Sequence, residues 1–193
     1  AYSLYTDDMQ NSAHRRFDFL SILLLAIATL LASARLVITK WLPDLGVIAT
    51  LTQLGLFMGV MIGYSRFKKM GTSIITLGYS LAFVPVLIYL IISPLLPPVE
   101  RLLELHTRLE QALSAFVAQE PVEDPLIVLI LLGLLFWIAA LYANFALLRY
   151  QNGLAALLPS TLLILAIQYN DHKLETPIWV LGFYFFFAFC CLP

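Results

Sequence analysis

The segment from Pro97 to Asp124 reads PPVERLLELHTRLEQALSAFVAQEPVED and is the longest polar interruption in the chain. Its apolar residues recur at spacings of three and four, which is the period of an amphipathic helix. These residues are Val99, Leu102, Leu103, Leu109, Leu113, Phe116 and Val117. Pro98 suits a first helical turn, Pro121 ends the helix, and Glu104 with Arg108 forms a favourable i,i+4 pair. Because this helix is too polar to span a bilayer, we expect it to lie flat on a membrane surface or against a partner.

The composition on either side of this segment decides the class of protein. The chain is 61% hydrophobic and only 12% charged, with a mean hydropathy of +0.90. A soluble domain of 193 residues could not bury that much apolar surface. Apolar runs of about 20 residues recur, and each is long enough to cross roughly 30 Å of hydrocarbon. The sequence therefore predicts an all-α, polytopic membrane helix bundle, and its net charge of -1 gives no reason to expect nucleic acid as a partner.

The apolar runs predict about six transmembrane helices, three on each side of the amphipathic helix. The expected spans are 17–38, 45–65, 71–93, 125–148, 154–169 and 177–193. Four parts follow: a cytoplasmic polar tail (1–16), a three-span half (17–93), an extracytoplasmic amphipathic helix and loop (94–124) and a second three-span half (125–193).

Charged and aromatic residues at the expected span ends indicate the orientation. The tight loop with Arg66, Lys68 and Lys69 predicts, by the positive-inside rule, that both termini are cytoplasmic and the amphipathic helix is outside. Arg35 is the only charge inside an apolar run, and we expect its long stem to reach the outer interface rather than to mark a substrate site. The residues assigned to the membrane interface are Arg35, Trp41, Arg66, Lys68, Lys69 and Arg149.

The residue types that usually carry chemistry are poorly placed for it. The three histidines, His14, His106 and His172, lie outside the expected spans, which disfavours this chain as a ligand of haem or chlorophyll. Cys190 and Cys191 are adjacent and lie in an apolar run, so we expect burial and neither a metal site nor a nucleophile. No aspartate or glutamate lies in the middle of an expected span, as ion-coupled transport would generally require. We therefore expect no catalytic residue and no metal ligand in this chain.

Small and polar residues inside the spans indicate helix packing. Gly55, Gly59 and Gly63 form GxxxGxxxG, a spacing that lets a neighbouring backbone approach closely. Packing within the chain's own bundle is favoured over dimerisation. Asn144 and Gln53 are neutral and could bond across helices.

The last span is rich in aromatic residues, namely Phe183, Tyr184, Phe185, Phe186, Phe187 and Phe189. They could pack against lipid, a partner helix or a polyene pigment. Contact with lipid or a partner protein is favoured, because aromatic side chains contribute apolar area before specificity. No cofactor is expected beyond such a non-covalent contact.

The second half of the chain resembles a known family. Asp124 with Pro125 opens the fourth span, Phe136 with Trp137 lies in its middle, Arg149 follows in a tight loop, and Pro159 lies in the fifth span. This pattern resembles the membrane part of bacterial transglutaminase-like membrane proteins. The resemblance implies an amino-terminal bundle of about six spans in the bacterial cytoplasmic (inner) membrane. In that family an extracytoplasmic papain-like domain with a Cys-His-Asp triad follows, and this chain ends before any position that could carry the triad.

Two functional hypotheses follow, with a third less favoured. The first is a non-catalytic anchor or scaffold module of a transglutaminase-like membrane protein. The second is an accessory or assembly subunit of a larger membrane complex, photosynthetic or respiratory. A small transporter is the least favoured, because charged residues are missing from the span interiors. On either leading hypothesis the partners are the lipid bilayer and other membrane protein subunits.

Overall fold

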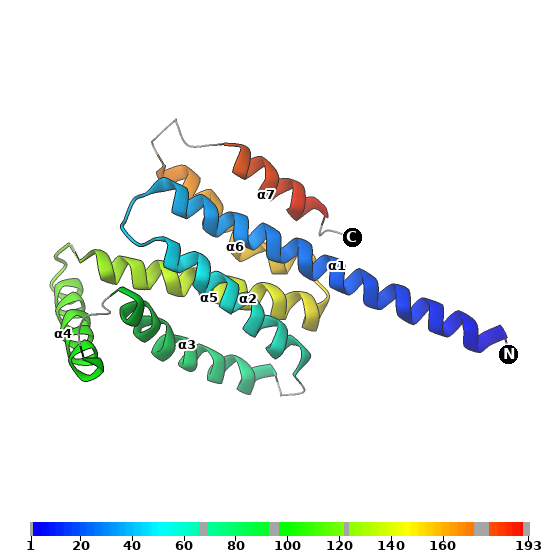
Figure 1. Cartoon of the computed structure of the whole chain (residues 1–193), viewed down its shortest axis with the longest axis horizontal. Helices are drawn as coiled ribbons and strands as arrows, with labels where there is room; N and C mark the ends of the chain where they lie inside the picture. The colour runs from blue at the N-terminus through cyan, green and yellow to red at the C-terminus, as the bar shows by residue number, and fades with distance from the viewer. Residues whose placement is uncertain (1, 66–68, 93–96, 122–123, 172–177, 191–193) are drawn as a thin grey trace.

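The computed structural model describes residues 2–65, 69–92, 97–121, 124–171 and 178–190 of the chain. Within these ranges the chain forms seven α-helices and no strand (Figure 1), so the all-α prediction is confirmed. The helices are α1 (Tyr2–Thr39), α2 (Gly46–Tyr64), α3 (Lys69–Ile92), α4 (Pro98–Val117), α5 (Pro125–Tyr150), α6 (Gly153–Asn170) and α7 (Trp179–Cys190). The polar segment expected as a tail thus continues the first helix.

Four helical segments among the described residues are long and apolar enough to cross a membrane. They are Phe19–Thr39, Gly46–Tyr64, Pro125–Tyr150 and Gly153–Asn170. The expected number of six is therefore wrong. The apolar segments at the other two places are shorter, namely Thr76–Tyr89 within α3 and the whole of α7. The 12 residues of α7 rise only about 18 Å, against roughly 30 Å of hydrocarbon.

The centre of the bundle is the contact between α2 and α5, the most extensive between any two helices. The glycines of α2 lie against successive turns of α5. A Cβ on Gly55 would lie 2.9 Å from the Trp137 carbonyl oxygen, and one on Gly59 would lie 2.6 Å from that of Leu141. One on Gly63 would lie 2.7 Å from the Leu148 side chain. Because the contacts advance along both helices in the same direction, α2 and α5 run parallel.

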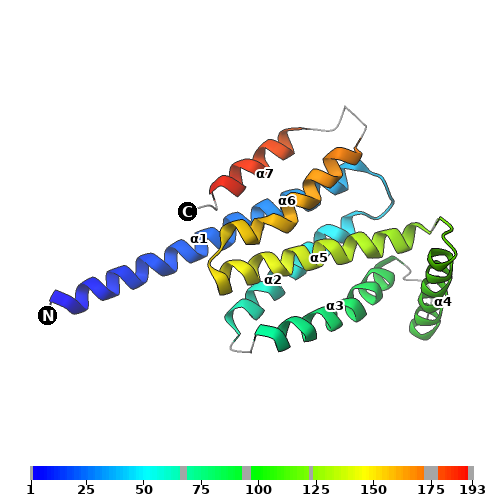
Figure 2. The same cartoon turned by 180° about the vertical axis from the view of Figure 1, so that it is seen from behind.

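Two parallel helices require the chain to return between them, and α3 provides that return. Its 24 residues rise about 36 Å, and it runs beside α5 in both views (Figures 1 and 2). Pro85 lies inside the helix without ending it. The Trp137 indole Nε1 donates a hydrogen bond to the Ser80 hydroxyl at 2.8 Å, which joins α5 to α3. The start of α5 is therefore carried to the same end of the bundle as the start of α2.

Helices α1, α6 and α7 complete the bundle on the other side of α5 (Figure 2). Small residues let α1 pack closely, since Ala28 and Ala32 are fully buried. The Tyr184 hydroxyl of α7 is hydrogen-bonded to the hydroxyls of Ser160 at 3.0 Å and Thr161 at 2.7 Å on α6. Together with the extensive packing of α7 on α1, these contacts fix α7 to the bundle.

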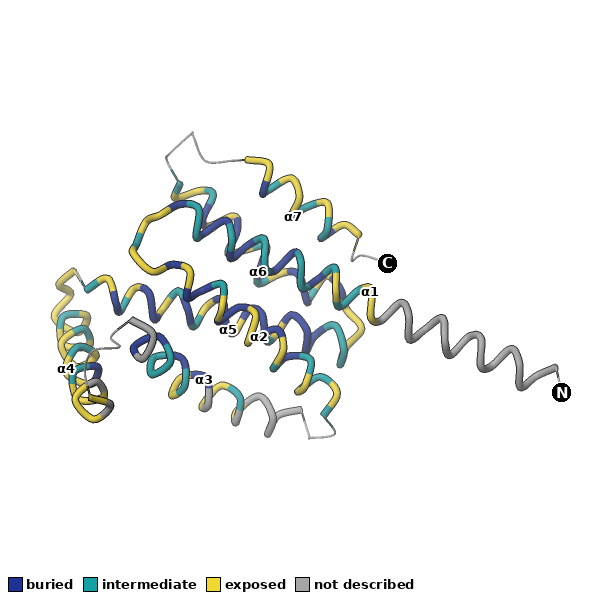
Figure 3. The backbone as a smooth tube through the Cα atoms, viewed as in Figure 1, coloured by how far each residue is buried: buried dark blue, intermediate teal, exposed yellow. Residues whose placement is uncertain are grey.

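The amphipathic helix expected in the polar segment is present as α4. It lies crosswise at one end of the bundle, next to the end of α3 and the start of α5 (Figures 1 and 2). We call this end the α4 end. Most of α4 is exposed, in contrast to the buried faces of α1, α2 and α5 (Figure 3). A helix in this position lies parallel to the membrane plane when the long helices cross it.

Candidate functional site

A polar cluster holds α4 to the bundle. The Tyr89 hydroxyl of α3 donates a hydrogen bond to the Glu104 carboxylate of α4. Arg108, one turn further along α4, donates to Glu104 Oε1 from Nη2 at 2.8 Å and from Nε at 3.1 Å. Arg108 Nη1 also lies 3.5 Å from Asp124 Oδ2. We call Tyr89, Glu104, Arg108 and Asp124 the α4 cluster, because these four side chains connect α3, α4 and the start of α5.

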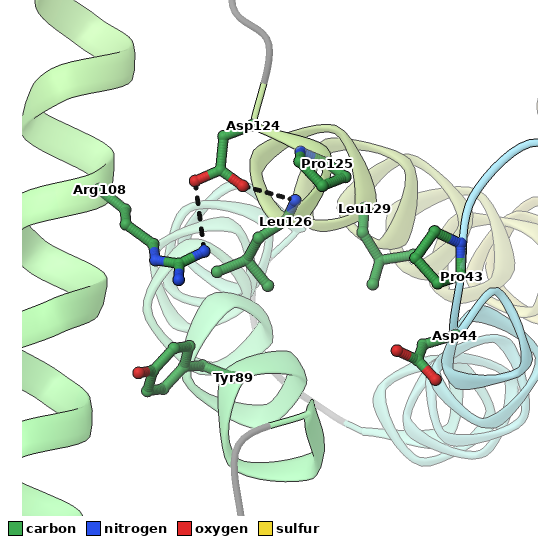
Figure 4. Close-up of a pocket in the computed structure, with 8 residues that line it drawn as sticks. All are labelled: Pro43, Asp44, Tyr89, Arg108, Asp124, Pro125, Leu126 and Leu129. Atoms are coloured by element: carbon green, nitrogen blue, oxygen red, sulfur yellow. Dashed lines mark hydrogen bonds and ion pairs between the residues drawn. The ribbon is translucent and has the colours of Figure 1, made fainter. Parts of the chain in front are cut away.

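The local sequence explains why these groups meet. Glu104 and Arg108 are separated by one helical turn, so their side chains lie on the same face of α4. Asp124 is fixed by a second interaction, because its Oδ1 accepts a hydrogen bond from the Leu126 backbone amide at 2.9 Å and caps α5 (Figure 4). Leu105 is buried beside the cluster and adds the apolar contact between α4 and the bundle.

The cluster changes the acidity of Glu104. The hydrogen bond from Tyr89 lowers the pKa of the Glu104 carboxyl below its usual value, and the hydrogen bonds and charge of Arg108 lower it further against an opposing effect of burial. The carboxylate is therefore ionised at neutral pH and serves as an acceptor. Glu104 and Arg108 therefore connect helices and are unsuited to general acid catalysis, because a general acid needs a raised pKa.

A cavity of about 160 Å³ lies next to the cluster (Figure 4). Its lining residues are Pro43, Asp44, Tyr89, Arg108, Asp124, Pro125, Leu126 and Leu129. A second cavity of about 300 Å³ lies between α2, α3 and α5. Its lining is mostly apolar with a few hydroxyls, from Ile62, Thr76, Leu77, Ser80, Ile138, Leu141, Tyr142, Phe145 and Tyr150. Such a lining fits an apolar chain better than a charged substrate.

Arg35 forms a second polar joint near the α4 end. Its Nη2 donates to Asp171 Oδ2 at 2.6 Å and to Gln168 Oε1 at 3.0 Å. The side chains of Arg35 and Asp171 have no exposed surface. The expectation that Arg35 extends to the outer interface is therefore corrected. The carboxylate that follows α6 lies close enough to pair with the guanidinium, so Arg35 joins α1 to the end of α6 inside the protein.

The predicted packing residues lie in the α2–α5 contact. Gly55, Gly59 and Gly63 face α5, as described above, and Asn144 Nδ2 donates to the Leu56 carbonyl oxygen at 2.8 Å. Asn144 thus bonds across helices, whereas Gln53 is exposed.

The predicted interface residues are only partly described. Arg149 Nη1 donates to the Ser65 carbonyl oxygen at 2.7 Å and joins the ends of α5 and α2 at the end opposite α4. Trp41 is exposed in the loop before α2. Lys69 is the first residue of α3. Arg66 and Lys68 lie outside the described residues.

The histidines and cysteines are not brought together by the described structure. His106 is exposed on α4, with Nδ1 3.9 Å from Glu110. His14 lies in α1, outside the residues with described side chains, and His172 and Cys191 lie outside the described ranges. Cys190 is exposed at the end of α7, so its expected burial is wrong, because an apolar run does not tell which side of the helix packs on the bundle. Among the described residues, no group of three or more His, Cys, Asp and Glu side chains could hold a metal ion.

The exposed aromatic residues of α7 form one face of the helix. Phe183, Phe186 and Phe189 are 51%, 61% and 70% exposed, while Tyr184 is fully buried against α6. The aromatic run therefore divides into a face that packs on the bundle and a face that meets whatever surrounds the protein.

The polar joints contain residues that sequence reasoning missed. Glu104 and Arg108 were recognisable as a pair from their spacing, but Tyr89, Gln168 and Asp171 carry no local signal of their role. Asp171 is 136 residues from Arg35 in the sequence, so only the fold brings the two together.

Comparison of the chain with protein-family models, with curated proteins and with solved structures gave no match.

Proposed function

We propose that the chain is a non-catalytic multi-pass membrane module that anchors or scaffolds a larger protein, as in the transglutaminase-like membrane proteins it resembles. The observation that carries this proposal is the use of its polar side chains. Arg35 with Asp171, the α4 cluster, and Asn144 with the Leu56 carbonyl each connect one helix to another. Side chains engaged in this way stabilise a framework, and the framework presents α4 at one end.

The proposed orientation places the amino terminus in the cytoplasm of a bacterial inner membrane and α4 outside. The parallel course of α2 and α5 supports it, because the loop between α2 and α3 then lies at the end opposite α4. Arg66 and Lys68 belong to that loop and Lys69 begins α3, and a basic segment of this kind is retained on the cytoplasmic side.

The test of the non-catalytic role is an assay of the purified 193-residue chain for peptide hydrolysis and amine transfer. A variant with Cys190→Ala and Cys191→Ala is assayed beside it. We expect no activity in either, because acyl transfer needs a thiolate with a base in hydrogen-bond reach. Activity in the first chain that disappears in the double variant would overturn the proposal.

An accessory or assembly subunit of a larger membrane complex is the second candidate. The exposed face of Phe183, Phe186 and Phe189 favours it, since a partner helix could cover these three aromatic side chains. A photoactivatable amino acid at Phe186 would test this in native membranes, with one at Leu162 on the exposed face of α6 as the control. A specific protein adduct at Phe186 alone supports the subunit role, and lipid adducts at both positions argue against it.

A further inference from the structure

The exposed apolar face of α4 is separate from the face that contacts the bundle. Seven apolar residues, which we call the α4 stripe, are between 38% and 79% exposed: Val99, Leu102, Leu103, Leu109, Leu113, Phe116 and Val117. Leu105, Glu104 and Arg108 contact the bundle. At 3.6 residues per turn the centre of the α4 stripe lies about a third of a turn from the centre of this contact face. The remaining side of α4 carries Thr107, Gln111 and Ser114, which are all exposed.

This division into three sides is what a helix at a membrane surface needs. One side packs on the protein, the next is apolar apart from the exposed pair of His106 and Glu110, and the third is polar. The α4 cluster fixes rotation about the helix axis, because Glu104 accepts a hydrogen bond from Tyr89 of α3 and Arg108 lies against Asp124 at the start of α5. The α4 stripe is therefore held in a set direction beside the bundle rather than free to turn toward it.

The connections of α4 keep it at the level of the bilayer surface. Only residues 118–124 separate Val117 from Pro125, the first residue of a 26-residue apolar span. At the other end of α4, residues 93–97 separate Pro98, its first residue, from Ile92, the last residue of α3. An apolar face tethered this closely at both ends and lying across the bundle (Figures 1 and 2) cannot leave the boundary between lipid and water.

The charges of α4 indicate which force holds the helix at the membrane surface. Its charged residues are Glu100, Arg101, Glu104, Arg108 and Glu110, so it carries three acids and two bases. Surface helices that depend on anionic lipids are rich in Lys and Arg on the polar side, and α4 is not. Burial of apolar area is therefore the force that holds the α4 stripe at the membrane surface.

We infer that the α4 stripe is buried in the lipid leaflet at the α4 end, at the boundary between headgroups and acyl chains, and that this contact does not depend on anionic lipid. The inference goes beyond the anchor role, because it assigns a lipid-binding surface to a helix that an anchor or a subunit could equally have used for a protein partner.

The test uses a chain with Cys190→Ala and Cys191→Ala and one new cysteine that carries a polarity-sensitive fluorophore. Leu113→Cys places the label on the α4 stripe. Gln111→Cys is the matched control, because two positions on a helix are about 200° apart around its axis. Both residues are exposed, so neither change removes a buried contact. Each protein is reconstituted in phosphatidylcholine vesicles with or without bromine on the acyl chains.

We expect the label at Leu113 to show blue-shifted emission and a loss of intensity in brominated vesicles, and the label at Gln111 to show neither. Addition of phosphatidylglycerol should leave the loss unchanged. Equal emission at the two positions without a loss in brominated vesicles would overturn the inference. A second result would also overturn it: the label at Leu113 keeps its intensity in brominated vesicles and quenches itself more strongly as the protein-to-lipid ratio rises. That result would assign the α4 stripe to contact with a second copy of the chain. A loss that appears only with phosphatidylglycerol would contradict the role given to apolar burial.

Discussion

The environment of Arg35 in the structure differs from the one that the sequence predicted. A lone arginine in an apolar run is costly to bury, which is why its stem was expected to reach the interface. The structure instead surrounds it with Asp171 and Gln168, so the charge is paired inside the protein. A buried pair is expensive to break on one side only, because the remaining charge stays buried without compensation.

This pair gives the first prediction. Arg35→Met should lower the free energy of unfolding by about 3–5 kcal/mol, and Asp171→Leu should do the same, because each leaves one buried charge. The double variant should be more stable than either single variant, since neither charge of this pair then remains to be desolvated. Thermal unfolding of the purified protein in detergent measures the three variants. Additive losses in the double variant would show that the two side chains act independently.

Glu104 gives a prediction on pH dependence. Its pKa in the folded chain is lowered from the ordinary value of 4.5, chiefly by the hydrogen bond from Tyr89 and then by Arg108. A lowered pKa means that the ionised carboxylate stabilises the α4 cluster above pH 4.5, and that this stabilisation is lost only as pH falls through the lower folded value. The motion of α4 should therefore increase only below pH 4.5.

A nitroxide label at Gln111 reports this motion. Glu104→Gln is the control, because the amide can still accept from Tyr89 but has no proton to gain in this range. The control should show increased motion at neutral pH, where the ionic attraction to Arg108 is missing, and a weaker response to acid. A wild-type transition centred above pH 4.5 would contradict the assignment.

At the scale of single residues, the sequence could predict pairs within one helix but not pairs between helices. Glu104 with Arg108 follows from i,i+4 spacing. Arg35 with Asp171, and Tyr89 with Glu104, depend on how the helices are placed in space, and hydropathy carries no information on that. The same limit applies to Ser80, which accepts the Trp137 hydrogen bond from another helix.

The helices α2 and α5 form the element on which the bundle depends. A Cβ at Gly59 would lie 2.6 Å from the backbone oxygen of Leu141, and a backbone atom cannot turn aside as a side-chain end can. Gly59→Leu should therefore force the two helices apart. We expect this to lower the free energy of unfolding by about 1–3 kcal/mol.

The matched control is Gly78→Leu in α3, where a Cβ would meet nothing within 4 Å. Both changes add the same side chain to a glycine within an apolar helix. We expect a clear fall in the melting temperature in detergent for Gly59→Leu and little change for Gly78→Leu. Equal melting temperatures for the two variants would show that close approach of α2 and α5 does not stabilise the protein.

Hydropathy predicted where helices lie better than it predicted which of them are full spans. Pro98 and Pro125 lie in first helical turns and α4 ends at Val117, near the expected limits. The number of spans was too high because two of the apolar runs counted as spans contain only shorter apolar segments among the described residues, namely Thr76–Tyr89 within α3 and Trp179–Cys190. The run from 177 onward is apolar throughout, but the described helix occupies only Trp179–Cys190.

The parallel course of α2 and α5 decides the arrangement of the whole molecule. It requires the chain between residues 65 and 124 to pass from one end of the bundle to the other, and α3 does so. The basic loop and α4 are therefore at opposite ends. Sequence reasoning reached the same separation from the distribution of Lys and Arg, whereas the packing that enforces it could not be inferred without the register of the glycines on α5.

The central claim is that α4 and the loop after α2 lie on opposite sides of a membrane, and labelling of single cysteines tests it most directly. Cysteines are placed at Gln111 and at Lys68 in a chain with Cys190→Ala and Cys191→Ala, and intact cells are treated with a membrane-impermeant maleimide. The account predicts that Gln111→Cys is labelled in intact cells and that Lys68→Cys is labelled only after the membrane is permeabilised. Labelling of both positions from outside would contradict the passage through α3, and labelling of Lys68→Cys with protection of Gln111→Cys would reverse the proposed orientation.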